Sequence, residues 1–235
     1  MTKKIKALAF LLLLLSPTAN AQLVGLNFRG DGQFNLASGT TAGETGGSTI
    51  VAQQNWNNAV NSNAVPGTNA NLTSSTGSAS NIAAAWLSND SWNAGGTVGG
   101  TGNAELSYGF MKAGGNPSIN ATVTFSGFAS GTLFDMVIYT TSDSNVTGTF
   151  TLNDTAATFA TYTVGAGNIA TFTENSTKHT FTNLTAVGSS VTLTMSGNTA
   201  GLAGVQFGIV PEPSSALLMG LGALTLLALR PRRRA

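Results

Sequence analysis

Cysteine is absent from the 235 residues of the chain, and histidine occurs once. The absence of cysteine excludes disulfide bonds and a Cys–His catalytic pair. Transition-metal sites that draw on several Cys and His ligands are excluded with them. No Gly-x-Ser-x-Gly sequence is present, so the nucleophile elbow of α/β-hydrolases is missing as well. We expect no cofactor.

Charged residues are also scarce, at 8% of the chain, and they are unevenly distributed. Lysine and arginine gather near the two termini, so the whole chain has a formal net charge of +1. The segment 22–209 has three basic and eight acidic residues, which gives it a formal net charge of −5. The basic residues are Arg29, Lys112 and Lys178, and the acidic ones are Asp31, Glu44, Asp90, Glu105, Asp135, Asp143, Asp154 and Glu174. Because nucleic acids are bound through basic surfaces, we expect no nucleic-acid partner.

The first 21 residues have the organisation of a secretory signal peptide. Three lysines within the first six residues form a basic region, residues 7–15 are apolar, and Ala19-Asn20-Ala21 has the small residues of a cleavage site. An uncleaved anchor helix is the alternative, but about nine apolar residues are too few to cross a bilayer. We therefore expect export through the secretion machinery and cleavage by signal peptidase before Gln22.

Residues 210–235 have three parts in a fixed order. The polar motif Pro211-Glu212-Pro213 precedes a predicted membrane helix at residues 214–229, and four arginines follow: Arg230, Arg232, Arg233 and Arg234. The apolar run, residues 216–229, would be about 21 Å long as a helix, short of the ~30 Å hydrocarbon core. Such a length suits a transient anchor better than a permanent one. The arginines are costly to translocate and form a membrane stop on the cytoplasmic side.

This arrangement resembles the PEP-CTERM sorting signal of bacterial exported proteins, which exosortase enzymes recognise. The resemblance implies that an exosortase acts on residues 211–213, that the membrane holds the chain transiently, and that the rest of the chain lies outside the cytoplasm. It also implies a Gram-negative bacterium that produces exopolysaccharide, with a destination at the cell surface or in the extracellular biofilm matrix. The alternatives are an ordinary short anchor, or a buried core helix followed by a basic segment.

Between these terminal segments, alternating hydrophobicity predicts about ten short strands. Residues 133–139 are apolar apart from Asp135, which is typical of a central strand buried on both faces. Residues 60–80 are predicted to be loop and short edge strand, and no capped helical pattern stands out. The expected strands are residues 23–28, 49–53, 82–87, 104–112, 119–125, 133–139, 146–152, 157–164, 180–182, 191–195 and 202–209.

Many short strands with frequent turns predict an all-β fold, an antiparallel β-sandwich over residues 22–209. The number of strands and the long early loops favour a jelly-roll arrangement over an immunoglobulin-like one. A β-solenoid would need a fixed repeat period, and none is present. The predicted organisation is a signal peptide at residues 1–21, the sandwich domain, and a sorting segment at residues 210–235.

Loose patterns in the predicted sandwich also resemble a group of PEP-CTERM exported proteins with jelly-roll-like domains. They are Gly-Leu-Asn-Phe at residues 25–28, Asn-Trp-Asn-Asn at 55–58, Ser-Trp at 91–92, the strand 135–139, and Gly-Val-Gln-Phe at 204–207. These patterns imply a shared fold and no chemistry.

The tryptophans are the main candidates for ligand contact. Sugar rings stack on exposed aromatic faces, and Trp56 and Trp92 each lie beside asparagines, whose amides bind hydroxyl groups. Both are therefore candidates for carbohydrate contact, and the alternative is core packing beside turn asparagines. Trp86 follows an Ile-Ala-Ala-Ala sequence and is expected in the core.

Oxygen-bearing turn residues could ligate calcium. Asp143, Asn145 and Asp154 flank the predicted strand 146–152, and Ca²⁺ prefers carboxylate and amide oxygens. The same residue types occupy turns that bind no metal, and we expect no metal.

Two ionisable residues lie in predicted strands. Burial of Asp135 within its apolar strand would raise the pKa of its carboxyl and suit it to acid–base chemistry. An acid at the edge of a strand, hydrogen-bonded to a neighbouring loop, is the favoured alternative. His179 lies in a polar stretch and is expected to face solvent.

The leading hypothesis is a non-enzymatic exported cell-surface or extracellular-matrix protein, which an exosortase sorts through residues 211–213. The first alternative is a carbohydrate-binding module of the exopolysaccharide matrix, with contacts at Trp56 or Trp92. The second is an extracellular glycan-active enzyme, for which two carboxylates would have to face each other across a cleft.

Overall fold

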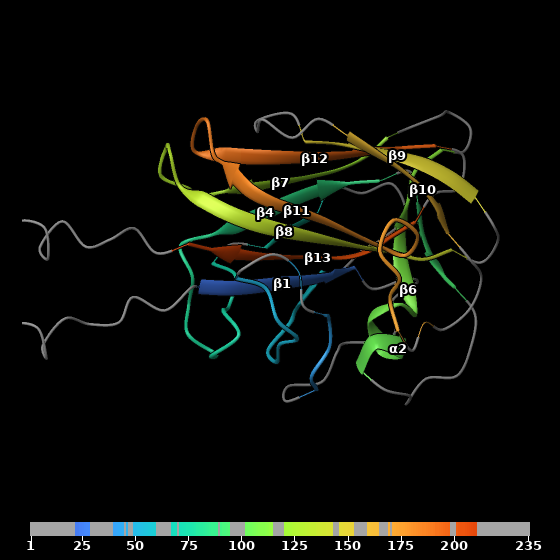
Figure 1. Ribbon diagram of the computed structural model, residues 1–235, viewed down its shortest axis with the longest axis horizontal. Helices are drawn as coiled ribbons and strands as arrows, with labels where there is room; N and C mark the ends of the chain where they lie inside the picture. Colours follow the sequence, from blue (N-terminus) through green and yellow to red (C-terminus); the bar gives the residue numbers. More distant parts are fainter. Residues whose placement is uncertain are drawn as a thin grey trace, which may run out of the picture. The chain divides into compact units, whose positions relative to one another are not determined.

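The computed structural model describes residues 22–28, 40–44, 46, 49–59, 67–69, 71–88, 90–94, 102–114, 120–142, 146–152, 159–164, 169, 171–197 and 201–210. Residues 21–210 form one compact unit, in which two β-sheets are the main elements (Figure 1). The predicted signal peptide and the predicted membrane helix at residues 214–229 lie outside the described residues. Within the described residues, no helix has the length and apolar character needed to span a membrane.

The first sheet has seven strands. Its main order is β11 (Lys178–Thr185), β8 (Leu133–Thr140), β13 (Gly201–Ile209), β1 (Gln22–Phe28) and β2 (Asn57–Ala59). In addition, β6 (Gly109–Lys112) pairs with β13, and β5 (Asp90–Asn93) pairs with β6. The pairing of β1 with β2 is parallel, and the other strand pairings described in this sheet are antiparallel.

The second sheet has six strands, and its described pairings are antiparallel. Its order is β10 (Phe159–Val164), β9 (Val146–Leu152), β12 (Ser190–Ser196), β7 (Ala121–Ser126), β4 (Ala83–Leu87) and β3 (Gly67–Asn69). Buried residues alternate with half-buried ones along β12, so one face of the sheet packs in the core. Phe125 of β7 meets Phe207 of the first sheet edge to face, with ring centroids 5.0 Å apart.

The predicted all-β class and the β-sandwich are confirmed. Most expected strands are present within a few residues of their predicted bounds, namely β1, β4 and β7 to β13. Hydrophobic alternation identified strands such as β7 and β12, in which every second side chain is buried, and a continuous apolar run identified β8. The jelly-roll arrangement stays a prediction.

Two expected strands are wrong. The segment 104–112 begins as a helix, α2 (Gly102–Leu106), and only its second half is strand β6. This short helix is closed by a hydrogen bond within the segment, which the Ser107 N–H donates to the Asn103 carbonyl at 3.0 Å. The segment 49–53 makes isolated bridges, such as Gly46 with Ile50, within one loop.

Strand β8 is buried on both faces, as predicted. Phe134, Met136 and Ile138 lie in the core between the sheets. Val137 and Tyr139 point the other way, into a second apolar cluster whose other members include Ile50, Trp56 and Phe172. The loop around residues 40–56 therefore covers the outer face of the first sheet. It packs directly on the backbone there, because a Cβ added at Gly25 would lie 2.6 Å from the Trp56 ring.

Candidate functional site

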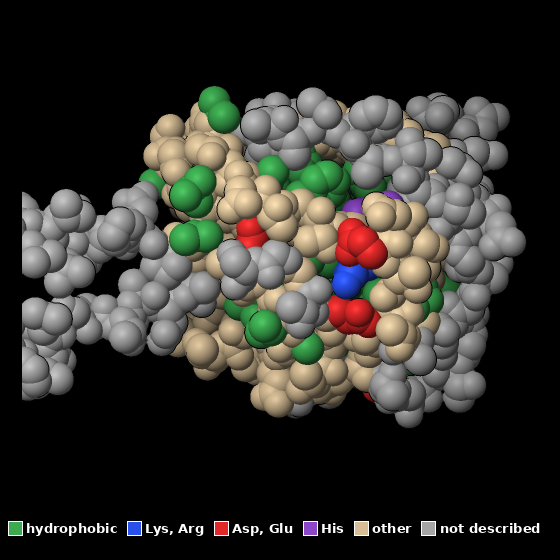
Figure 2. Space-filling view, in the orientation of Figure 1, with side chains coloured by type: hydrophobic (Ala, Val, Ile, Leu, Met, Phe, Trp, Pro, Cys, Tyr) green, Lys and Arg blue, Asp and Glu red, His purple; other side chains and the backbone are tan. Residues whose placement is uncertain are grey.

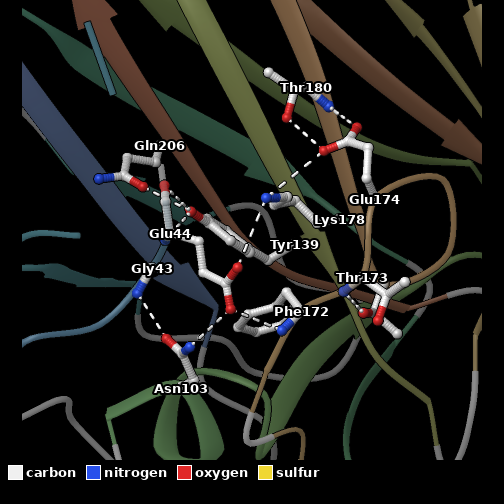
Figure 3. Close-up of polar contacts among 11 residues, drawn as sticks. Gly43, Glu44, Asn103, Tyr139, Phe172, Thr173, Glu174, Lys178, Thr180 and Gln206 are labelled. Atoms are coloured by element: carbon white, nitrogen blue, oxygen red, sulfur yellow. Dashed lines mark hydrogen bonds and ion pairs between the residues drawn. The ribbon is translucent and has the colours of Figure 1, made fainter. Parts of the chain in front are cut away.

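Polar side chains from the covering loops meet over the outer face of β8 (Figure 3). At their centre is a charged cluster, which we define as Glu44, Glu174 and Lys178. The Lys178 Nζ lies 3.7 Å from the Glu44 Oε2 and 3.7 Å from the Glu174 Oε2. In the space-filling view one basic side chain lies between two acidic ones (Figure 2).

Glu44 connects three segments of the chain. Its Oε1 accepts hydrogen bonds from the Asn103 Nδ2 of α2 at 3.1 Å and from the Phe172 N–H at 2.9 Å. The Asn103 Oδ1 in turn accepts from the Gly43 N–H at 2.9 Å. Through Lys178, Glu44 is also linked to β11. The carboxylate thus joins loops that are distant in sequence.

Glu174 precedes β11 and is held by hydrogen bonds from that strand. The Thr180 N–H donates to one of its carboxylate oxygens and the Thr180 hydroxyl to the other, each at 2.7 Å. Both carboxylates of the charged cluster therefore have structural partners, and an ammonium group lies between them. This arrangement offsets part of the acidic charge and fixes loops.

Tyr139 of β8 connects to the same loops by hydrogen bonds. Its hydroxyl accepts from the Glu44 N–H at 2.9 Å and donates to the Gln206 Oε1 at 2.7 Å. The Gln206 Nε2 donates to the Val51 carbonyl at 2.7 Å. Burial raises the pKa of the Tyr139 hydroxyl well above its ordinary value, so it stays protonated and keeps donating.

Asp135 is buried, with 1% of its surface exposed. Its Oδ2 accepts from the Thr49 N–H at 3.1 Å and from the Thr49 hydroxyl at 2.9 Å, and its Oδ1 accepts from the Asn183 N–H at 2.9 Å. Asn183 lies at a register shift in β11 with a φ of 56°. The register shift turns the Asn183 N–H away from the hydrogen bonds between β11 and β8. The Asp135 carboxylate accepts a hydrogen bond from this N–H instead. The expected hydrogen bonds from a neighbouring loop are confirmed by Thr49, although β8 lies between β11 and β13 in the sheet.

The expectation that His179 faces solvent is wrong. Its side chain is 2% exposed, and its ring meets the Phe150 ring edge to face, with centroids 5.5 Å apart. Its neighbours Lys178 and Thr180 lie on the opposite face of β11, so strand alternation directs His179 inward. Burial lowers the pKa of the imidazole.

The three tryptophans differ in exposure. Trp86 is 5% exposed, and its predicted core position is confirmed. Trp56 is 6% exposed, and its indole N–H donates to the Gln53 carbonyl at 3.2 Å, so no face of this ring is open to a sugar. Trp92 on β5 is 42% exposed, and the Lys112 Nζ lies 5.2 Å from its ring centroid.

Several predicted site residues lie outside the described residues. They are the motif Pro211, Glu212 and Pro213, the four arginines Arg230, Arg232, Arg233 and Arg234, and the calcium candidates Asp143, Asn145 and Asp154. Among the residues that the structure does describe, no group of three or more Asp, Glu or His side chains is arranged to hold a metal ion.

Comparison with known proteins decides the meaning of the C-terminal segment. Residues 210–234 match the family profile described as the PEP-CTERM protein-sorting motif. The chain carries a PEP-CTERM sorting signal. This signal implies export, processing by an exosortase, and transient anchoring in the membrane by the C-terminal region.

Other comparisons add little about the sandwich. No curated protein matches the chain. Among solved structures, it is similar to the CBM36-1 domain of a multidomain xylanase from the hindgut metagenome of Trinervitermes trinervoides. The identity is 19% and the TM-score 0.32, with 50% of this chain and 90% of that domain covered. A similarity this low supports no argument about ligand or activity.

The sequence alone did not identify the charged cluster or the contact of Lys112 with Trp92. A signal was available, because Lys112 and Lys178 are two of only three basic residues between positions 22 and 209. In a segment with so few cations, each is expected to have a specific partner. Lys112 meets Trp92 through the pairing of β5 with β6. The partners of Lys178 depend on the loops around residues 44 and 174, whose course the sequence does not give.

Proposed function

We propose that this PEP-CTERM protein is a non-enzymatic component of the cell surface or extracellular matrix, delivered there when an exosortase processes residues 211–213. The observation that carries the proposal is the sorting motif at residues 210–234. It directly follows β13, the last strand of the sandwich, which ends at Ile209. In this proposal the sandwich is the part that is delivered, and the motif is the sorting signal that directs its delivery.

The contacts of the acidic side chains favour a non-enzymatic role. Glu44 and Glu174 share Lys178, while Asp135 is bound by Thr49 and Asn183. A glycosidase needs two carboxylates that face a substrate from opposite sides. Here an ammonium group occupies the space between the two clustered carboxylates, which supports a structural function for them.

The sorting proposal is tested by comparing three forms in cell fractions. The first is the full chain, the second lacks residues 211–235, and the third is the double variant Pro211→Ala, Pro213→Ala. We expect processing and release of the full chain, release without sorting of the shortened form, and retention of the double variant in the membrane. Ser215→Ala is the matched control, since it alters a neighbouring residue and leaves the motif intact. Release of the double variant to the same extent as the full chain would contradict the proposal.

A carbohydrate-binding module of the exopolysaccharide matrix is the second candidate function. It is favoured by Trp92, whose ring is 42% exposed beside the Lys112 ammonium. Aromatic rings of this kind stack on sugars, and the cation would attract acidic ones.

Iodide quenching of tryptophan fluorescence tests this second function. Trp56 and Trp86 are buried, so iodide reaches Trp92 most readily. Binding predicts that polysaccharide protects Trp92 from iodide in the full protein. The protected fraction should disappear in Trp92→Phe and persist in Leu87→Ala, an exposed control on another strand. No protection across neutral and acidic glycans would argue against binding.

A further inference from the structure

Both ends of the compact unit lie at the same end of the sandwich, at the left of Figure 1. Gln22 at the start of β1 pairs with Ile209 at the end of β13. The Val210 N–H donates to the Leu133 carbonyl at 2.9 Å, where β8 begins. The turns at residues 127–132 and 186–189 lie beside Leu133, since the Ala186 N–H donates to the Thr132 carbonyl at 3.0 Å. We call residues 127–133, 186–189 and 210 the exit rim.

The exit rim contains no charged residue. Two of its apolar side chains are exposed, Leu133 at 46% and Val187 at 73%. In the space-filling view, hydrophobic side chains gather at this end of the molecule (Figure 2). Asp135, the nearest acidic residue in sequence, is buried and bound to Thr49.

The charged cluster lies at the opposite end of the same strands. Lys178 starts β11 and pairs with Tyr139 near the end of β8, whereas Thr185 ends β11 and pairs with Leu133. Lys112 likewise pairs with Gly201, at the far end of β13 from Val210. The sandwich is therefore polarised along its strands, and the sorting motif follows from the uncharged end.

Chain length keeps the exit rim close to the membrane while the anchor is in place. Pro211 is bonded to Val210, and the predicted membrane segment begins at Ser214. Four residues span at most about 14 Å when fully extended. The headgroup layer on each side of the hydrocarbon core is about 5–8 Å thick. The reach beyond the headgroups is therefore only about 6–9 Å.

We propose that the exit rim is a membrane-contact surface, and that Leu133 and Val187 enter the headgroup region of the bilayer before processing. The proposal rests on the transient anchoring described above. Exposed apolar side chains are stabilised at the interface, and an uncharged surface avoids repulsion between acidic residues and anionic lipids. Two side chains bury too little apolar area to hold the sandwich alone. Contact therefore ends when the exosortase separates the sandwich from its anchor.

The absence of cysteine allows a direct test by single labels. Val187→Cys places a bimane fluorophore on the exit rim, and Thr173→Cys places one next to Glu174 at the opposite end. The anchored form is isolated from cells without exosortase and reconstituted in phosphatidylethanolamine–phosphatidylglycerol vesicles that carry nitroxide-labelled headgroups. We expect headgroup quenching at least threefold stronger at position 187 than at position 173. A chain without residues 211–235, exported in the same way, should show no difference between the two positions.

Flotation of the vesicles separates the two ways in which the test can fail. If the anchored form floats with the vesicles but both labels are quenched equally, the membrane-contact surface is excluded and anchoring stands. If the full chain does not float, the anchoring itself is wrong, and the contact surface falls with it. Stronger quenching at position 187 in the chain without residues 211–235 would overturn the dependence on the anchor.

Discussion

The two ends of the sandwich differ in the charge of their side chains and in what those side chains contact. At one end, Lys178 forms ion pairs with both Glu44 and Glu174 and connects the loops to β11. At the other end, the exit rim has no charge and leaves Leu133 and Val187 exposed. Because the protein has few charged residues, the position of each charged side chain is more informative than the net charge. The charged end serves the fold, and the uncharged end is where the PEP-CTERM signal begins.

The largest loss of stability is expected from breaking the charged cluster with Lys178→Met. The Lys178 side chain is 12% exposed, and its removal leaves Glu44 and Glu174 facing each other without a cation. Removing one partner of a fully buried pair costs about 3–5 kcal/mol. Because the Glu174 side chain is 42% exposed, we expect a smaller loss of about 2 kcal/mol in urea unfolding.

Lys112→Met is the matched control for this variant. Lys112 is also a cation at the charged end, but it lies over the exposed Trp92 ring rather than between two carboxylates. Its loss should cost about 0.5–1 kcal/mol. A Lys178→Met cost no greater than that of Lys112→Met would mean that the charged cluster is a surface feature, and the contrast between the two ends would lose its basis in stability.

The next effect is expected from Tyr139→Phe, which keeps the ring and removes the hydroxyl. The Glu44 N–H and the Gln206 Oε1 then lose their hydrogen bonds to this buried group. We expect a loss of about 1–2 kcal/mol in the free energy of unfolding. A double-mutant cycle with Lys178→Met tests whether the two residues act as one unit, since contacts through Glu44 should make the two losses non-additive. Strict additivity would show that the network consists of independent parts.

Sequence patterns predicted strands better than they predicted surfaces. The apolar run at residues 133–139 indicated β8, because a strand covered on both faces needs apolar residues at every position. The polar stretch around His179 predicts an exposed side chain, which is wrong. Alternation with Lys178 and Thr180 indicates the opposite, a side chain that points inward. Trp56 and Trp92 have similar neighbours in sequence, yet one is buried and the other exposed. Only the course of the covering loop separates them, and tertiary contacts determine that course.

A smaller effect is expected from pH through His179. Burial lowers the pKa of this imidazole in the folded state, so the unfolded chain binds a proton more readily. Stability is then fully present above the unfolded pKa of about 6.5 and falls as pH decreases below it. One proton limits the slope to about 1.4 kcal/mol for each pH unit. Urea unfolding between pH 7 and pH 5 should show this slope in the wild type and lose it in His179→Gln. The same slope in both proteins would assign the pH dependence to carboxylates.

The smallest effect on folding is expected at the exit rim, from Val187→Ser. Val187 is 73% exposed, so its replacement should change the free energy of unfolding by about 0.5 kcal/mol or less. The same substitution at Val191, which is 0% exposed in β12, should cost more than about 2 kcal/mol. A loss above about 1 kcal/mol at position 187 would show that this side chain belongs to the core.

If Val187→Ser leaves folding unchanged, the apolar side chain has its effect outside the fold, and the membrane is where that effect should appear. A bimane label on Ser189→Cys, two residues away, reports on the rim without replacing either apolar residue. In the anchored form, adding Val187→Ser should weaken headgroup quenching of this label about twofold, because the rim loses one of its two exposed apolar contacts. Thr171→Ser at the charged end should leave the quenching as it was. Unchanged quenching in the Val187→Ser protein would mean that the short link from Val210 to the anchor, rather than apolar contact, holds the rim near the bilayer.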